Sequence, residues 1–141
     1  VYKRQSNTLG CCNPIKEITK LARDKGSLVL LDACQSLAHQ KLDIHELGID
    51  FLAGSGHKLC GPTGIGFLWA RKEILEKIPP FFGGGEMIQD VFEEKSTWAE
   101  LPHKFEAGTP AIAEAIGLAA AINYINNIGL DRISEYEKEI P

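Results

Sequence analysis

Hydrophobic and polar residues alternate along the first half of the chain in blocks that predict helices and strands in turn. Asn13 and Pro14 are typical of a helix start, and Gly26 is placed to end that helix. The apolar positions between them recur at helical spacing and predict one buried face of Ile15, Ile18, Leu21 and Ala22. Residues 27–32 contain four consecutive apolar residues, a run that is typical of a buried parallel strand. This alternation favours an α/β fold.

The same patterns predict elements as far as the C-terminal end. We expect a short helix or turn at 42–47, strands at 50–53 and 65–70, a helix at 71–77, an irregular glycine-rich loop at 81–97, a long helix from Thr109 and Pro110 to about residue 126, and a last helix at 130–139. The long helix is expected to bury the face that carries Ile112, Ala115, Ile116, Ala119 and Ile122.

Composition and charge narrow the class of protein. The chain has 141 residues, of which 44% are hydrophobic, so it can build a core of its own. Its net charge of −4 argues against a nucleic-acid partner. The longest apolar stretch, 111–125, contains Glu114 and Asn123 and falls short of the roughly 18 residues of a membrane span. The cysteines (Cys11, Cys12, Cys34 and Cys60) lack metal-site spacing and predict reduced thiols in a cytosol-like compartment.

The most informative residue is Lys58, which lies in a glycine-rich run directly after the second predicted strand. A lysine in such a turn can bind a carbonyl cofactor as a Schiff base. Asp32 stands at the end of the first predicted strand, where a carboxylate can keep a pyridine nitrogen protonated. The pair is the one that pyridoxal phosphate (PLP) requires. A lone lysine or strand-end aspartate is more often a solvated residue or a turn former, so the combination carries the inference.

Other polar residues can serve the remaining groups of PLP. Asn7 and Gln35 are amides at loop positions that can reach the ring oxygen, and Ser55 and His57 can bind the phosphate. Each has an ordinary alternative: Asn7 and Ser55 as turn residues, and His57 as a surface or core histidine. Thr109 is equally well explained as the N-cap of the helix that Pro110 begins.

Three longer motifs carry a resemblance to a known family. The segment 55–67 reads SGHKLCGPTGIGF, 83–88 reads GGGEMI and 105–110 reads FEAGTP. The first resembles the PLP-lysine segment of the class V aminotransferase superfamily. Together the three resemble the SufS-like (group II) cysteine desulfurases, and the resemblance runs from about Ser6 to the C-terminal end.

The resemblance implies fold type I, in which a mostly parallel sheet lies between helices, and a homodimer. It implies roles for the candidate residues: Lys58 as the PLP lysine, Asp32 at the pyridine nitrogen, Asn7 and Gln35 at the ring oxygen, Ser55 and His57 at the phosphate, and Thr109 as a phosphate contact made across the dimer. The loop 83–106 would lie near the active-site mouth and the dimer interface.

The implied reaction converts L-cysteine to L-alanine and passes the sulfur, as a persulfide, to a SufE-type carrier for iron–sulfur cluster assembly. The implied location is the cytoplasm, or a plastid in a eukaryote. The family's nucleophilic cysteine, its carboxylate-binding arginine and its ring-stacking histidine match no residue here. We therefore expect residues 6–141 to be part of the PLP-binding large domain, without its N-terminal part or the small domain. Residues 1–5 are expected to be foreign or disordered.

Two alternatives remain open at this stage. Selenocysteine lyase or another class V chemistry can use the same scaffold, with selenocysteine in place of cysteine. The chain can also be an inactive truncated form that at most binds a partner. The adjacent pair Cys11 and Cys12 has no role in any of these readings.

Overall fold

The computed structural model describes residues 1–140 and divides the chain into two compact units. The first unit contains residues 1–70 and the C-terminal part from Ala113 onward, and the second contains residues 71–112. The candidate lysine and the parallel strands belong to the first unit, so this unit positions most of the candidate site.

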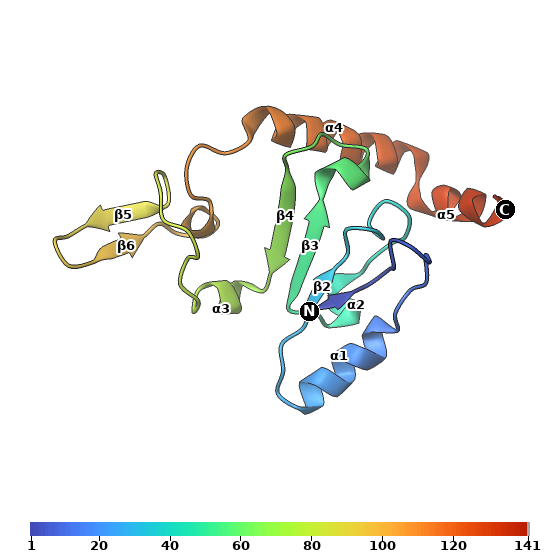
Figure 1. Cartoon of the computed structure of the whole chain (residues 1–141), viewed down its shortest axis with the longest axis horizontal. Coiled ribbons are helices and arrows are strands. Elements are labelled where there is room, and N and C mark those ends of the chain that lie inside the picture. The colour runs from blue at the N-terminus through green and yellow to red at the C-terminus, as the bar shows by residue number, and fades with distance from the viewer. Residues whose placement is uncertain (141) are drawn as a thin grey trace. The chain divides into compact units, whose positions relative to one another are not determined.

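The first unit is built on a four-stranded sheet in the order β1 (Tyr2–Lys3), β2 (Leu30–Asp32), β3 (Phe51–Ser55) and β4 (Gly66–Ala70) (Figure 1). Strands β1, β2 and β3 are parallel, and β4 is antiparallel to β3. The register places Lys3 beside Asp32 and Asp32 beside Ala53. The carboxyl ends of three strands therefore lie at one edge of the sheet, which is the usual location of a ligand site in α/β proteins.

The sequence-based expectation for residues 1–5 is that they are foreign or disordered; two of them are ordered in the sheet, and a foreign origin stays a prediction. Tyr2 and Lys3 form β1, and the Arg4 N–H donates a hydrogen bond to the Asp32 carbonyl oxygen at 2.9 Å. The outer edge of β2 offers unpaired backbone groups, and pairing with them gives this polar segment an ordered place.

Helix α1 (Ile15–Asp24) packs on the sheet through Ile15, which is 3% exposed. It ends as expected before Gly26, whose φ is +68°. Its first turn differs from the prediction: Pro14 occupies the N-cap position, and the Asn13 side chain donates to the Lys3 carbonyl oxygen instead. Leu21 is exposed, because the buried face runs at helical spacing through residues 15, 18, 19 and 22, and Leu21 lies outside it. The core of this side comprises Ile15, Val29, Leu31, Ala33, Ile49 and Leu52.

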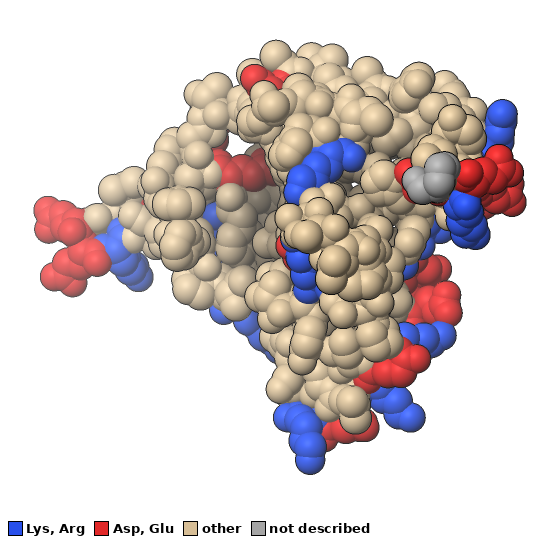
Figure 2. All heavy atoms as spheres, turned by 45° about the vertical axis from the view of Figure 1, so that its right-hand side comes forward, with Lys and Arg blue, Asp and Glu red and all other residues tan. Residues whose placement is uncertain are grey.

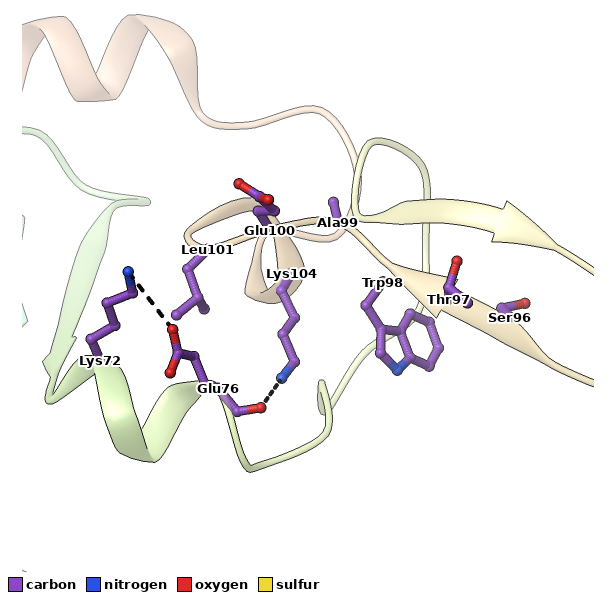
Figure 3. Close-up of a pocket in the computed structure, with 9 residues that line it drawn as sticks. All are labelled: Lys72, Glu76, Ser96, Thr97, Trp98, Ala99, Glu100, Leu101 and Lys104. Carbon is purple, nitrogen blue, oxygen red and sulfur yellow. Dashed lines mark hydrogen bonds and ion pairs between the residues drawn. The ribbon is translucent and has the colours of Figure 1, made fainter.

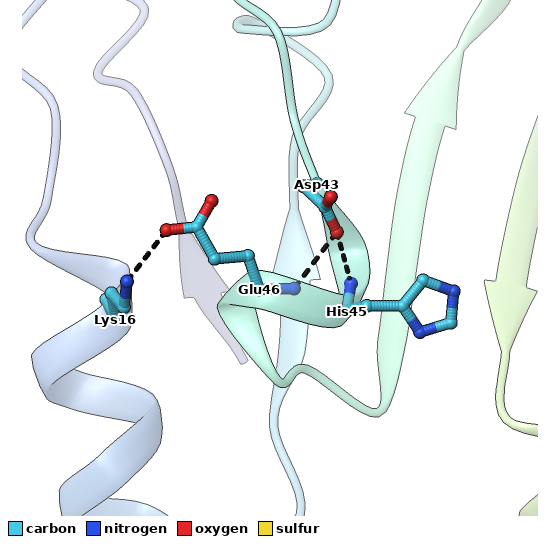
Figure 4. A network of polar contacts seen from close by, with 4 residues as sticks. All are labelled: Lys16, Asp43, His45 and Glu46. Carbon is cyan, nitrogen blue, oxygen red and sulfur yellow. Dashed lines mark hydrogen bonds and ion pairs between the residues drawn. The ribbon is translucent and has the colours of Figure 1, made fainter.

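The short helix α2 (Ile44–Leu47) confirms the turn predicted there and begins with a side-chain cap (Figure 4). One Asp43 carboxylate oxygen accepts hydrogen bonds from the backbone N–H groups of His45 at 2.8 Å and Glu46 at 3.0 Å. The Lys16 ammonium lies 2.7 Å from the Glu46 carboxylate and links α1 to α2. Since both of these charged groups are exposed, this ion pair adds little stability.

Helices α4 (Ile112–Ile128) and α5 (Leu130–Glu139) close a second cluster. Its buried members are Ala38, Leu59, Leu118 and Ile125. The predicted buried face of α4 is wrong: Ile116 is 69% exposed, whereas Leu118 is 8% exposed. The reason lies in the composition of α4, which is apolar almost all round with Glu114 as its one charged residue, so periodicity cannot select a face. Figure 2 shows few charged side chains over this helix.

The second unit contains α3 (Lys72–Leu75) and a hairpin of β5 (Ile88–Val91) and β6 (Ser96–Trp98). The predicted irregular loop at 81–97 is therefore partly regular. Ile88 pairs with Trp98, and the Phe92 N–H closes the turn on the Lys95 carbonyl oxygen at 2.8 Å. Strands this short carry too few alternating positions to give a pattern in the sequence.

Within residues 1–140, no helix has the length and apolar character that crossing a membrane requires.

Candidate functional site

The carboxyl edge of the parallel strands collects most of the predicted site residues. Asn7 follows β1, Asp32 ends β2, and Gln35 lies in the turn after β2. Ser55 ends β3 and leads directly into a 3₁₀ turn, Gly56–Leu59, that carries Lys58. The alternation of helix and strand that predicts an α/β fold also explains this gathering, because parallel strands end at the same edge.

The turn around Lys58 is tight enough to require glycine. A Cβ atom at Gly56 would lie 2.7 Å from the Cγ2 atom of Ile65, and one at Gly61 would lie 2.8 Å from the Gly56 carbonyl oxygen. The Gly61 N–H donates to that same oxygen at 3.0 Å. Cys60, between Lys58 and Gly61, adopts a left-handed conformation with φ at +57°. These close approaches fix the path of the chain on both sides of the lysine.

Packing of the residue that follows Lys58 holds the turn in place. Leu59 is 7% exposed and belongs to the same cluster as Leu118 and Ile125 of α4. Lys58 itself is half-buried. No hydrogen bond or ion pair within residues 1–140 engages its amine. The lysine is thus held by its backbone while its amine stays available.

The Asp32 carboxyl group has a pKa below its ordinary value. Burial is the largest single influence and acts to raise the pKa. Hydrogen bonds from Cys34, whose backbone N–H lies 3.0 Å from Oδ1, act in the opposite direction. The positive charges of Lys3 and Lys58 lower the pKa further, and the combined lowering effects outweigh burial. Asp32 is therefore an anion at neutral pH.

The Cys34 thiol, in contrast, has a pKa above its ordinary value. Burial raises the pKa of its thiol, and the hydrogen bond and negative charge of Asp32 raise it further, against a smaller lowering by Lys58. The thiol also lies 3.8 Å from the Ala53 carbonyl oxygen. It is a protonated, half-buried group, which makes it a poor nucleophile.

Ser55 and His57 lie together on the turn that carries the lysine. The Ser55 hydroxyl oxygen is 3.1 Å from the His57 Nδ1 atom, and His57 is exposed while Ser55 is half-buried. A hydroxyl group and an imidazole side by side can bind an anionic group such as a phosphate. Their assignment to a phosphate stays a prediction.

The loop after β1 holds Asn7 beside a lysine that sequence reasoning missed. The Lys3 ammonium donates to the Asn7 side-chain oxygen at 2.9 Å, and Lys3 also sits beside Asp32 in the sheet. Lys3 belongs to the segment expected to be foreign, and a two-residue polar strand leaves no pattern that points to it. Asn7 is exposed and Gln35 is half-buried, and their roles stay predictions.

Thr109 lies in the second unit. It lines a pocket of about 230 Å³ with Glu86, His103, Glu106, Gly108 and Pro110. The prediction that Thr109 is the N-cap of the long helix is wrong, because α4 begins only at Ile112. Its contact with a phosphate across a dimer stays a prediction.

A larger pocket of about 520 Å³ also lies in the second unit (Figure 3). Lys104 reaches across it and donates to the Leu75 and Glu76 carbonyl oxygens, at 3.0 and 3.2 Å. The pocket is lined by Lys72, Glu76, Ser96, Thr97, Trp98, Ala99, Glu100, Leu101 and Lys104. None of the predicted site residues lines this pocket.

Comparison with known proteins decides the family. The family model described as Aminotransferase class-V matches residues 1–141. The chain belongs to the class-V aminotransferase family. This class-V aminotransferase chain is 59% identical over 135 residues to a Synechocystis sp. protein named "Probable cysteine desulfurase". The aligned region covers 96% of this chain and 32% of the relative. The chain thus spans about a third of the length of the curated relatives it matches.

Solved structures share the fold of this class-V aminotransferase chain. The apo cysteine desulfurase of Thermococcus onnurineus NA1 matches with a TM-score of 0.89 and 45% identity, over 94% of this chain and 34% of that chain. A mutant of a protein called C-DES, with glycine covalently linked to its PLP cofactor, matches with a TM-score of 0.78 and 30% identity, over 90% of this chain and 34% of that chain. The α/β fold type expected from the sequence is confirmed.

Proposed function

We propose that this chain is the central, cofactor-binding part of a PLP-dependent cysteine desulfurase of the SufS-like type. The observation that carries the proposal is that Lys58 and an anionic Asp32 both lie at the carboxyl edge of the parallel strands, in a chain whose relatives are named cysteine desulfurases. A lysine amine and a strand-end carboxylate supply the two groups that PLP chemistry needs most.

The side chains present fit this cofactor. Lys58 is half-buried, and its amine, which makes no hydrogen bond or ion pair within residues 1–140, can bind an aldehyde. Asp32 is an acceptor that stays ionised and so suits a protonated ring nitrogen. Ser55 and His57, 3.1 Å apart, suit a phosphate. When bound, PLP supplies the electron sink for chemistry at the carbon next to the amino group.

The residues of the chain then have distinct tasks. Lys58 removes and returns the α-proton of the substrate as a general base and acid. Asp32 holds the proton on the ring nitrogen. Asn7 and Gln35 orient the ring through its oxygen. Ser55 and His57 hold the phosphate, and Thr109 completes that contact from the partner of a homodimer.

The sulfur-accepting thiol is expected outside these residues. Cys34 is the cysteine nearest to Asp32 along the chain, and its raised pKa keeps the thiol protonated. The persulfide would form on a cysteine elsewhere in the longer protein and pass to a SufE-type carrier for iron–sulfur assembly. We place that protein in the cytoplasm, or in the plastid of a eukaryote. The 141-residue piece is expected to be inactive by itself.

A product assay on the full-length protein tests the proposal. L-cysteine is supplied with a reductant, and alanine and sulfide are measured. We expect Lys58→Ala to lower alanine formation at least about 100-fold, the lower limit for loss of a general acid–base group. Lys77, an exposed lysine of the same chain, provides the control variant Lys77→Ala, which should retain activity. Full activity of Lys58→Ala would refute the proposal, and alanine formed from selenocysteine alone would favour a selenocysteine lyase.

A further inference from the structure

Cys11 and Cys12 are adjacent in the chain, and both thiols are exposed and free of disulfides. They lie on the returning arm of the loop that carries Asn7. The proposed desulfurase chemistry uses neither residue. Two neighbouring exposed thiols offer a chelating pair of soft sulfur ligands, which a single cysteine cannot provide.

The loop that holds the two cysteines is a small hairpin. The Ser6 N–H donates to the Cys11 carbonyl oxygen at 3.0 Å, and the Asn13 N–H donates to the Arg4 carbonyl oxygen at 2.8 Å. These bonds make an antiparallel bridge between Gln5 and Cys12. Gly10, directly before the pair, has φ at +68° and open space around it.

The Cys12 thiol contacts neutral groups. Its sulfur accepts a hydrogen bond from the Gln40 side-chain nitrogen at 3.5 Å, and it lies 4.0 Å from both the Gly10 carbonyl oxygen and the Gln40 side-chain oxygen. None of these contacts is an ion pair. A ligand that forms covalent bonds to sulfur therefore displaces little when it binds.

We propose that Cys11 and Cys12 form a two-sulfur site for thiophilic trivalent arsenicals. Zinc requires about four ligands in a structural site, and residues 1–140 contain no group of three or more potential ligands that could hold a metal. An organic trivalent arsenical, R–As=O, needs only two sulfur ligands beside its carbon. Two As–S bonds form, the As=O bond breaks, and the two thiol protons leave with the oxygen as water. No atom is oxidised or reduced.

Binding has a structural consequence for the hairpin. Cys12 lies in an extended bridge, where neighbouring side chains point to opposite sides of the backbone. To bring both sulfurs to one arsenic atom, the backbone between Cys11 and Cys12 must leave this extended conformation. Because the Cys11 carbonyl oxygen holds the Ser6 N–H, occupancy of the site should loosen this bond and the loop that carries Asn7.

Phenylarsine oxide and intact-mass spectrometry of the full-length protein test the proposal. We expect an adduct of one phenylarsenic group less two hydrogen atoms, stable to a monothiol wash and removed by a dithiol. Cys11→Ser and Cys12→Ser should each abolish the wash-resistant adduct. Cys60→Ser, which removes an exposed isolated thiol, should retain it.

A wash-resistant adduct that persists in the Cys11→Ser and Cys12→Ser variants would overturn the assignment, as would a wild-type adduct that the monothiol removes. Hydrogen exchange gives a second readout without any activity assay. The Ser6 amide should exchange at least several-fold faster in the arsenical-loaded protein than in the free protein. Unchanged exchange at Ser6 would overturn the predicted coupling to the loop.

Discussion

Leu59 and Leu118 lie in one buried cluster, 7% and 8% exposed, and join the turn that carries Lys58 to helix α4. A Cβ atom at Gly61 would also approach the Cδ1 atom of Leu118 to 3.1 Å. The position of the lysine therefore depends on packing against a helix that lies far along the chain. This dependence links stability of the second cluster to cofactor binding.

Truncation of Leu118 should weaken both the stability of the second cluster and the binding of the cofactor. Leu118→Ala leaves a cavity under the Lys58 turn and should lower the free energy of unfolding by about 2–5 kcal/mol, the usual range for a buried leucine. Urea denaturation of the full-length protein measures this loss, and PLP absorbance measures cofactor occupancy. Leu118→Met conserves volume and should cost less than about 1.5 kcal/mol. Equal losses for the two variants would contradict the packing argument.

The variant Gly56→Ala tests how tightly the turn that carries Lys58 is packed. The added methyl group would meet the Ile65 side chain at 2.7 Å and its carbonyl oxygen at 2.9 Å. Such overpacking should destabilise the protein by about 1–3 kcal/mol. The matched control is Gly83→Ala, because nothing lies within 4 Å of a Cβ atom there. A thermal melt in which both variants behave alike would show that the turn has room to spare.

The central strands and the site edge could be predicted because their signals are local. The apolar run before Asp32, and the glycine-rich run around Lys58, each lie within a few residues of the side chain they position. The parallel pairing of β2 and β3 then follows from the helical segment between predicted strands.

The features that sequence reasoning missed depend on distant contacts. The buried face of α4 is chosen by Leu59 and Ala38, and nothing in the apolar helix itself distinguishes Leu118 from Ile116. The role of Lys3 depends on a two-residue strand that forms only because β2 offers an edge. Thr109 and Pro110 resemble a helix start, but α4 begins two residues after Pro110.

The charge cluster at Asp32 predicts a pH dependence in the cofactor-free protein. Since the folded-state pKa of Asp32 is lowered, its contribution to stability is complete above the unfolded-state pKa of about 3.9. That contribution is lost as the pH falls through the lower, folded-state pKa. The stability difference between wild type and Asp32→Asn should therefore shrink in acid. NMR titration should give an Asp32 midpoint below 3.9, and Lys58→Ala should raise it. A midpoint that Lys58→Ala leaves unchanged would exclude the coupling.

The reactivity of the Cys34 thiol should report the same interaction with Asp32. Its raised pKa predicts slower alkylation by iodoacetamide near pH 8 than at the exposed Cys60. Asp32→Asn removes a hydrogen bond and a negative charge that raise the pKa of this thiol, so it should speed up alkylation of Cys34. The rate at Cys60 serves as the internal control. Slower alkylation of Cys34 in Asp32→Asn would contradict the account.

The central claim is that Lys58 binds the cofactor, and borohydride trapping tests it most directly. The full-length protein is loaded with PLP and reduced with sodium borohydride, which fixes the cofactor to the lysine amine as a stable secondary amine. The protein is then digested and its peptides are mapped by mass spectrometry. We predict that the peptide containing Lys58 carries the reduced pyridoxal phosphate group and that Lys58→Ala carries none. Trapping on another lysine, or equal labelling of Lys58→Ala, would contradict the account.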